Sequence, residues 1–163
     1  MSKNFSTQAV HAGETMNKPY GTLTTPVVRS STFTFTDTAQ ILDFVERKGR
    51  GEPPTRHEYG RYSNPTQDTV ERKVAALEGG ERALLFSSGM NAITTAILTL
   101  LKAGDHMLIL DGAYRRTQDF ARDFLPKWEI ESTFVPIDDV AAMAAAIRPT
   151  TRLIFAETPT NPY

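Results

Sequence analysis

The stretch LLFSSGMNAI, residues 84–93, joins an apolar run to three small residues and then to a helical pattern. Residues 83–86 have the composition of a buried strand, and the apolar residues of 90–102 recur with the period of a helix. Ser87, Ser88 and Gly89 stand at the junction between them. A strand that passes into a helix through small residues is typical of an α/β protein with a parallel sheet.

The same alternation continues on both sides of this junction. Upstream, Asn64 is suited to cap a helix, Pro65 fits its first position, and Gly79 is suited to end it. Downstream, the sequence predicts strands at 107–110, near 132–135 and at 153–156, and helices at about 117–125 and 138–147. Strands and helices that alternate at this spacing predict a mainly parallel sheet with helices on its faces.

The chain before Tyr59 is polar and broken. Residues 37–48 have the pattern of a short helix with Ile41, Leu42 and Val45 on one face. This part has too few periodic apolar residues to form a core of its own. We therefore expect residues 1–58 to be an arm that packs on another protein surface, and 59–163 to be the first, incomplete part of a larger α/β domain.

Composition excludes several classes of function. The chain has 163 residues, 23% of them charged, and a net charge of −1, which gives no reason to expect nucleic acid or an anionic membrane as partner. It has no cysteine, which removes disulfides and thiolate metal sites, and its three histidines share no metal-ligand spacing. No apolar run has the length of a signal peptide or a membrane span, so we expect a cytoplasmic protein.

Ligands of an open parallel sheet bind beyond the carboxyl ends of its strands. Three predicted strands end in polar or small residues, within the segments 87–91, 111–116 and 157–163. At the first of these ends, small residues allow close approach, and the first N–H groups of the helix lack acceptors. The pattern therefore favours a phosphate, although it matches neither nucleotide glycine motif, and Ser88 as a simple helix cap is the alternative.

The other candidate residues are ambiguous by themselves. Tyr114 is placed to stack on a flat ligand or to pack in the core, and Arg115 and Arg116 suit a solvated helix start. Tyr59 and Arg61, which flank a glycine before the capped helix, can both hydrogen-bond a phosphate, but ordinary turn residues look the same.

Five motifs taken in order are more specific than any one residue. They are VHAGE (10–14), YGRYSNPT (59–66), VAALEGGERALLFSSGMNAI (74–93), DGAYRRT (111–117) and ETPTNPY (157–163). Together they closely resemble the cystathionine synthase and lyase family of pyridoxal-phosphate enzymes over nearly the whole chain. The resemblance implies the large cofactor domain of the aspartate-aminotransferase type (fold type I) and pyridoxal 5'-phosphate as cofactor.

The resemblance also implies roles for individual residues. Ser88, Gly89 and Met90 would form the phosphate cradle, with the last two as backbone N–H donors. Tyr114 would stack on the pyridine ring, and Asn161 would lie near the phenolic oxygen of that ring.

A second group of residues is implied to act between subunits. Tyr59 and Arg61 would reach the phosphate of a neighbouring subunit, in a homotetramer built from dimers with shared active sites. The N-terminal arm would then pack on that partner.

The two arginines after Tyr114 look most like the cystathionine γ-synthase branch, especially its plant-type members. Such enzymes use cysteine to replace the γ-substituent of an O-acylated or O-phosphorylated homoserine in methionine biosynthesis. A cystathionine lyase or a methionine γ-lyase would use the same anchors, with cystathionine or methionine as substrate.

The family needs a lysine in a Ser-x-x-Thr-Lys setting to bind the cofactor covalently. None of the six lysines has that setting: Lys3, Lys18, Lys48, Lys73, Lys102 and Lys127. We therefore expect an active full-length enzyme of which these 163 residues alone are inactive. A catalytically inactive fragment that acts only as an interaction piece is the alternative of another class.

Overall fold

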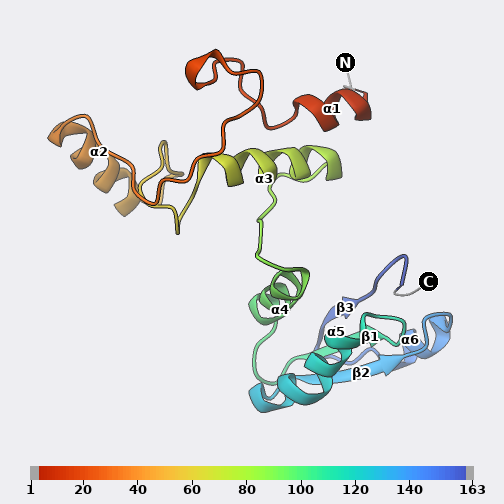
Figure 1. The fold of residues 1–163 in the computed structure, drawn as a ribbon. Helices are drawn as coiled ribbons and strands as arrows, with labels where there is room; N and C mark the ends of the chain where they lie inside the picture. The colour runs from red at the N-terminus through yellow and green to blue at the C-terminus, as the bar shows by residue number, and fades with distance from the viewer. Residues whose placement is uncertain (1–3, 161–163) are drawn as a thin grey trace. The chain divides into compact units, whose positions relative to one another are not determined.

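The computed structural model describes residues 4–160 and divides into two compact units, one up to Leu85 and one from Phe86 (Figure 1). The two units are called here the N-terminal unit and the C-terminal unit. The boundary expected between residues 58 and 59 lies inside the N-terminal unit. That residues 1–58 act as an arm on a neighbouring subunit stays a prediction.

The N-terminal unit is helical, and its longest helix begins and ends as predicted. The Asn64 side chain accepts a hydrogen bond from the Thr66 N–H at 2.9 Å, Pro65 is the first helical residue, and Gly79 ends the helix with a φ of 66°. The helices of this unit are α1 (Phe5–His11), the 3-10 turn η1 (Pro19–Gly21), α2 (Thr38–Gly49) and α3 (Pro65–Glu78).

The apolar face predicted for α2 is not packed within this unit. Ile41, Leu42 and Val45 are 41%, 58% and 58% exposed, whereas Phe44 is the buried side chain of the helix. Phe44 meets the ring of Phe35 edge-on at 5.5 Å. The helix was therefore predicted correctly, but within the described chain the apolar side chains of this face are exposed to solvent.

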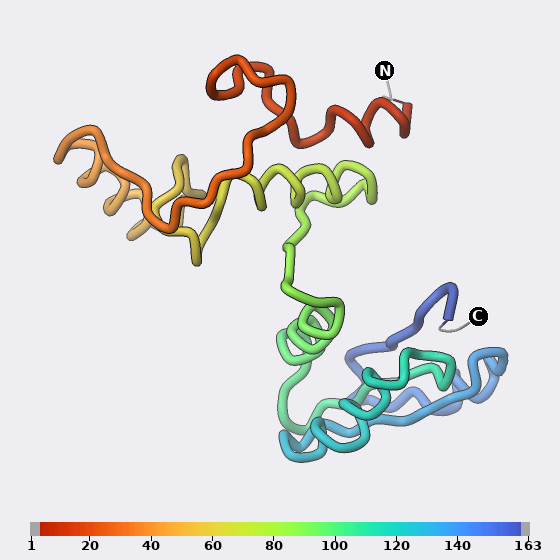
Figure 2. Tube along the Cα trace, in the orientation of Figure 1, coloured from red at the N-terminus to blue at the C-terminus, as the bar shows by residue number. Residues whose placement is uncertain are grey.

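The C-terminal unit is an α/β structure with three parallel strands in the order β2-β1-β3. This confirms the predicted parallel sheet, because β1, β2 and β3 lie where strands were expected. Figure 2 shows the path of the chain through this unit. The elements of this unit are α4 (Gly89–Leu100), β1 (His106–Leu110), α5 (Arg115–Asp119), the π-turn η2 (Phe120–Phe124), the 3-10 turn η3 (Leu125–Trp128), β2 (Glu131–Val135), α6 (Val140–Ala146) and β3 (Thr151–Phe155).

The strand predicted at residues 83–86 is wrong for this chain. The segment is extended, but it pairs with no strand among residues 4–160, and the Leu85 N–H donates instead to the Glu71 carboxylate at 2.8 Å. A strand exists only where a second strand supplies its ladder of hydrogen bonds, which an apolar pattern cannot guarantee.

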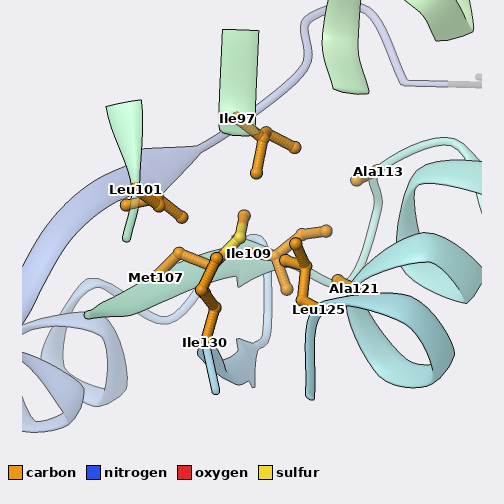
Figure 3. Close-up of a cluster of buried hydrophobic side chains, with 8 residues drawn as sticks. All are labelled: Ile97, Leu101, Met107, Ile109, Ala113, Ala121, Leu125 and Ile130. Carbon is orange, nitrogen blue, oxygen red and sulfur yellow. The ribbon is translucent and has the colours of Figure 1, made fainter. Parts of the chain in front are cut away.

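The core of the C-terminal unit lies between β1, the helix α4 and the segments η2 and η3. β1 is buried along its whole length because it is the middle strand of the sheet. Figure 3 shows Ile97 and Leu101 directed toward Met107 and Ile109 of β1. This packing fixes the carboxyl end of β1, where the candidate site begins. Within residues 4–160, no helix has the length and apolar character required to cross a membrane.

Candidate functional site

The junction before α4 forms a small, exposed cradle of Ser88, Gly89 and Met90. The Ser88 hydroxyl accepts the Asn91 N–H at 3.1 Å, and the Ser88 carbonyl accepts the Ala92 N–H at 3.1 Å. Ser88 is thus the helix cap, as one interpretation of the sequence held. Capping leaves Gly89 and Met90, the first two helical residues, with N–H groups that have no acceptor inside the helix.

The space above the cradle is open. A Cβ atom added to Gly89 would meet no atom within 4 Å, and Ser87, Ser88 and Gly89 are all exposed. An anion can therefore reach the two N–H groups at the positive end of a 12-residue helix. These residues fit the phosphate group of the expected cofactor.

Tyr114 lies in the same unit, directly after the loop that follows β1. Tyr114 is 38% exposed, so its side chain is not buried in the core. One turn later, the buried Thr117 contacts the Met90 sulfur through its hydroxyl at 3.7 Å. The helix that begins beside Tyr114 is therefore in contact with the cradle.

The loops after the three strands are joined to one another at this end of the sheet. The Asp111 carboxylate accepts the Ile137 N–H at 3.1 Å, and the Glu157 carboxylate accepts the Tyr114 N–H at 2.9 Å. The Gln118 amide donates to the carbonyls of Asp111 and Ala113 at 2.7 and 2.8 Å. Sequence reasoning predicted that strand ends meet here, but it missed the roles of Gln118 and Glu157.

The two arginines after Tyr114 differ in their partners. Arg116 forms an ion pair with Asp119 at 3.3 Å, and both arginines are exposed. Arg115 forms no ion pair within the described part of the chain. Asn161, the residue implied to lie near the phenolic oxygen, is outside the described residues.

Tyr59 and Arg61 form a separate group in the N-terminal unit. They lie on a tight turn held by two backbone bonds, Gly60 N–H to the Ser31 carbonyl at 2.7 Å and Tyr62 N–H to the Tyr59 carbonyl at 2.9 Å. The Arg61 guanidinium lies over the Tyr59 ring, 4.9 Å from its centre. The structure thus presents the two predicted phosphate ligands together.

The charge next to this turn is compensated. Lys48 donates to the Glu58 carboxylate at 2.8 Å, and this hydrogen bond raises the pKa of Lys48. Lys48 is therefore held in an ion pair with Glu58.

The C-terminal unit offers no described lysine at the cradle. Lys102 follows the far end of α4, which is about 18 Å from its start by helix geometry. Lys127 lies in η3. Among residues 4–160, no cluster of three or more His, Asp or Glu is placed to hold a metal ion.

Comparison with known proteins gives consistent results along the chain. The model of the family described as Cys/Met metabolism PLP-dependent enzyme matches residues 6–163. The chloroplastic cystathionine gamma-synthase 1 of Arabidopsis thaliana is 41% identical over 94% of this chain and 27% of that protein. The L-methionine gamma-lyase of Porphyromonas gingivalis is 41% identical over 99% of this chain and 39% of that protein.

Solved structures are similar as well. The crystal structure of metB from Corynebacterium glutamicum has a TM-score of 0.84 and 36% identity, over 99% of this chain and 39% of that one. A cystathionine gamma-lyase from Lactobacillus plantarum, complexed with L-serine, has a TM-score of 0.82 and 35% identity, over 98% of this chain and 38% of that one. The chain spans between about a quarter and two fifths of the length of these relatives.

Proposed function

Because this chain belongs to the pyridoxal-phosphate-dependent enzymes of cysteine and methionine metabolism, we propose that it is the N-terminal part of a cystathionine γ-synthase. The reaction replaces the γ-substituent of an O-acylated or O-phosphorylated homoserine with the sulfur of cysteine. The family is enzymatic and uses pyridoxal phosphate, and the amino-acid substrates and the direction of the reaction are the proposed part.

The observation that carries the proposal is the open cradle of Ser88, Gly89 and Met90 close to Tyr114. Two backbone N–H groups and a helix dipole suit a phosphate ester, and an exposed ring in the same unit suits a flat aromatic ligand. When bound, the cofactor would supply an electron sink for negative charge on substrate carbons. Gly89 and Met90 would hold its phosphate, Tyr114 would fix the plane of its ring, and Asn161 would lie near its phenolic oxygen.

Tyr59 and Arg61 are proposed to bind the phosphate held by a neighbouring subunit, in a homotetramer of dimers. The turn that presents them is held by two backbone hydrogen bonds, and both side chains are exposed. The exposed apolar residues of α2 support a protein partner, since Ile41, Leu42 and Val45 would otherwise remain in contact with water. Residues 1–58 would then be the arm that packs on that subunit.

Arg115 favours the synthase over the lyases. It is exposed, it follows the stacking residue directly, and its guanidinium has no ion-pair partner within residues 4–160. A guanidinium at that position suits an anionic ester such as O-phosphohomoserine. Identity alone does not decide, because a synthase and a methionine γ-lyase are both 41% identical to this chain.

The test is an assay of the full-length protein with pyridoxal phosphate. We expect cystathionine from cysteine and an activated homoserine ester, and little release of methanethiol from methionine or of cysteine from cystathionine. Rapid cleavage of methionine or cystathionine, with no condensation, would overturn the synthase in favour of a lyase. The 163-residue chain serves as the control, because it is predicted to give no turnover and no stoichiometric lysine adduct after borohydride treatment.

Failure of the full-length protein to bind pyridoxal phosphate would favour the interaction piece instead. A cytoplasmic location also stays a prediction, which fractionation of the source cells would test.

A further inference from the structure

We propose that Glu157 is a positioning residue, which sets the Tyr114 ring for contact with the cofactor through a hydrogen bond to the Tyr114 backbone. This inference rests on the proposed function, because it concerns the orientation of a ring that binds pyridoxal phosphate. The bond joins two residues 43 positions apart, from the Tyr114 N–H to the Glu157 carboxylate at 2.9 Å.

Tyr114 has little local support for its orientation. It precedes α5, a helix of only five residues, and its side chain makes no capping hydrogen bond. Its φ of −50° and ψ of 131° are not helical, and as the residue before the helix it donates no helical hydrogen bond through its own N–H. The direction of its Cα–Cβ bond therefore depends on what holds the peptide group before it.

The sheet brings Glu157 close to that peptide group. Glu157 lies two residues after β3, and β3 pairs with β1 up to the register Ile109 to Phe155. A carboxylate that accepts an N–H forms a charge-assisted hydrogen bond, which is stronger than one between neutral groups. The carbonyl of Tyr114 is held as well, because it accepts the N–H groups of Thr117 and Gln118 at 2.9 and 3.1 Å.

The loop before Tyr114 has little space in which to shift. A Cβ atom on Gly112 would come within 2.9 Å of both Ile137 and Thr160, which follow the two neighbouring strands. Gln118 clamps the same loop through the carbonyls of Asp111 and Ala113. With the loop confined in this way, the Glu157 bond is the contact that specifies the amide of Tyr114 itself.

Loss of this hydrogen bond should change the orientation of the Tyr114 ring more than it lowers the free energy of unfolding. Glu157 is only half-buried and Tyr114 is exposed, so little apolar surface depends on their contact. Glu157→Gln keeps an oxygen that can accept the Tyr114 N–H, whereas Glu157→Leu removes the acceptor at similar volume. Glu78→Leu is the matched control, because Glu78 is an exposed glutamate at the end of α3 and forms no ion pair within residues 4–160.

The first measurement uses the full-length apoprotein and is independent of the cofactor. Hydrogen exchange by mass spectrometry, on peptides that contain Tyr114, should be about tenfold faster in Glu157→Leu and close to wild type in Glu157→Gln and Glu78→Leu. Unchanged exchange in Glu157→Leu would overturn the inference.

The second measurement is the dissociation constant of pyridoxal phosphate, with its absorption spectrum and the melting temperature of the apoprotein. We expect Glu157→Leu to weaken binding by about tenfold and to shift the spectrum, with rescue in Glu157→Gln and nearly constant melting temperature. Equal affinity in wild type and Glu157→Leu would overturn the inference, as would a fall in melting temperature that accounts for the whole loss. If the wild-type protein binds no pyridoxal phosphate, the proposed function fails, and the exchange measurement alone judges the hydrogen bond.

Discussion

The two ends of β1 carry polar residues that are used in opposite ways. At its start, His106 is 1% exposed, and both ring nitrogens are hydrogen-bonded, to Thr133 on β2 and to Thr151 on β3, each at 2.8 Å. Beyond its end, Tyr114 is 38% exposed. At the start of the strand the polar side chain is buried and fully hydrogen-bonded, and we call this the closed end. Beyond the other end the side chain of Tyr114 is exposed, and we call this the open end.

Arg148 completes the closed end. Its backbone N–H donates to the Thr151 hydroxyl at 2.8 Å, and its guanidinium donates to the Thr133 hydroxyl at 3.1 Å. Within residues 4–160, both ring nitrogens of His106 and the hydroxyls of Thr133 and Thr151 are thus engaged in hydrogen bonds. At the open end, the N–H groups of Gly89 and Met90 have no acceptor within their helix. The difference shows that a buried polar residue at the start of β1 can specify the register of the sheet. Residues beyond the carboxyl end of the same strand are free to bind a ligand.

The largest expected effect is a difference in the free energy of unfolding between two alanine variants, one at each end of β1. His106→Ala should lower the free energy of unfolding by about 2–4 kcal/mol, because it opens a cavity and leaves two hydroxyls without one partner each. Tyr114→Ala should cost roughly 1 kcal/mol or less, since its residue is partly exposed. Urea denaturation of the apoprotein measures both. Similar losses for the two variants would remove the distinction between the ends.

A smaller effect is the pH dependence of stability at the closed end. Burial lowers the pKa of His106 below its usual 6.5, and the positive charge of Arg148 lowers this pKa further, against a small opposing effect of Glu131. The folded state therefore favours the neutral ring. Its contribution is fully present above pH 6.5 and is lost as the pH falls below that value toward the lower folded pKa.

The measurement is the urea midpoint between pH 8 and pH 5, in wild type and in His106→Gln. Wild type should lose stability over the lower part of this range, and the variant should lose less, because glutamine takes up no proton there. Two parallel curves would show that His106 does not control this dependence.

Local patterns predicted most of the fold and the centre of the site. Asn64 and Gly79 were read correctly as the start and stop signals of α3, because caps depend on neighbouring residues. β1 and β3 were found because each contains a short apolar run between turn residues, and β2 because Thr133, Phe134 and Val135 are residue types that favour strands. The junction at Gly89 was found for the same reason, since a strand-like segment, small residues and a helix follow one another.

What sequence missed depends on residues far apart. Residues 83–86 have the composition of a strand, but no strand among residues 4–160 pairs with them. The bond from Tyr114 to Glu157 spans 43 residues, and no local pattern signals it. The helix expected near 117–125 is α-helical only in Arg115–Asp119 and continues as a π-helix over Phe120–Phe124.

The smallest expected effect is a change in KM when the positive charge of Arg115 at the open end is removed. Arg115 has no ion-pair partner in residues 4–160, whereas Arg116 is paired with Asp119 at 3.3 Å. If the substrate is an anionic ester, Arg115→Ala should raise the KM for O-phosphohomoserine by about two- to fivefold, the value of an exposed ion pair. Arg116→Ala should change this KM less, because its guanidinium is already neutralised by a carboxylate.

O-acetylhomoserine, whose leaving group is uncharged in the ester, is the control substrate for both variants. Its KM should stay within twofold of wild type, roughly the limit of a contact that lacks charge. Added salt should shrink the difference between the two esters, since exposed charges are screened within about 10 Å at 0.1 M. An equal rise in KM for both esters would mean that Arg115 supports the loop rather than the substrate charge. The open end of the sheet would then select its ligand by shape and by the backbone donors of the cradle alone.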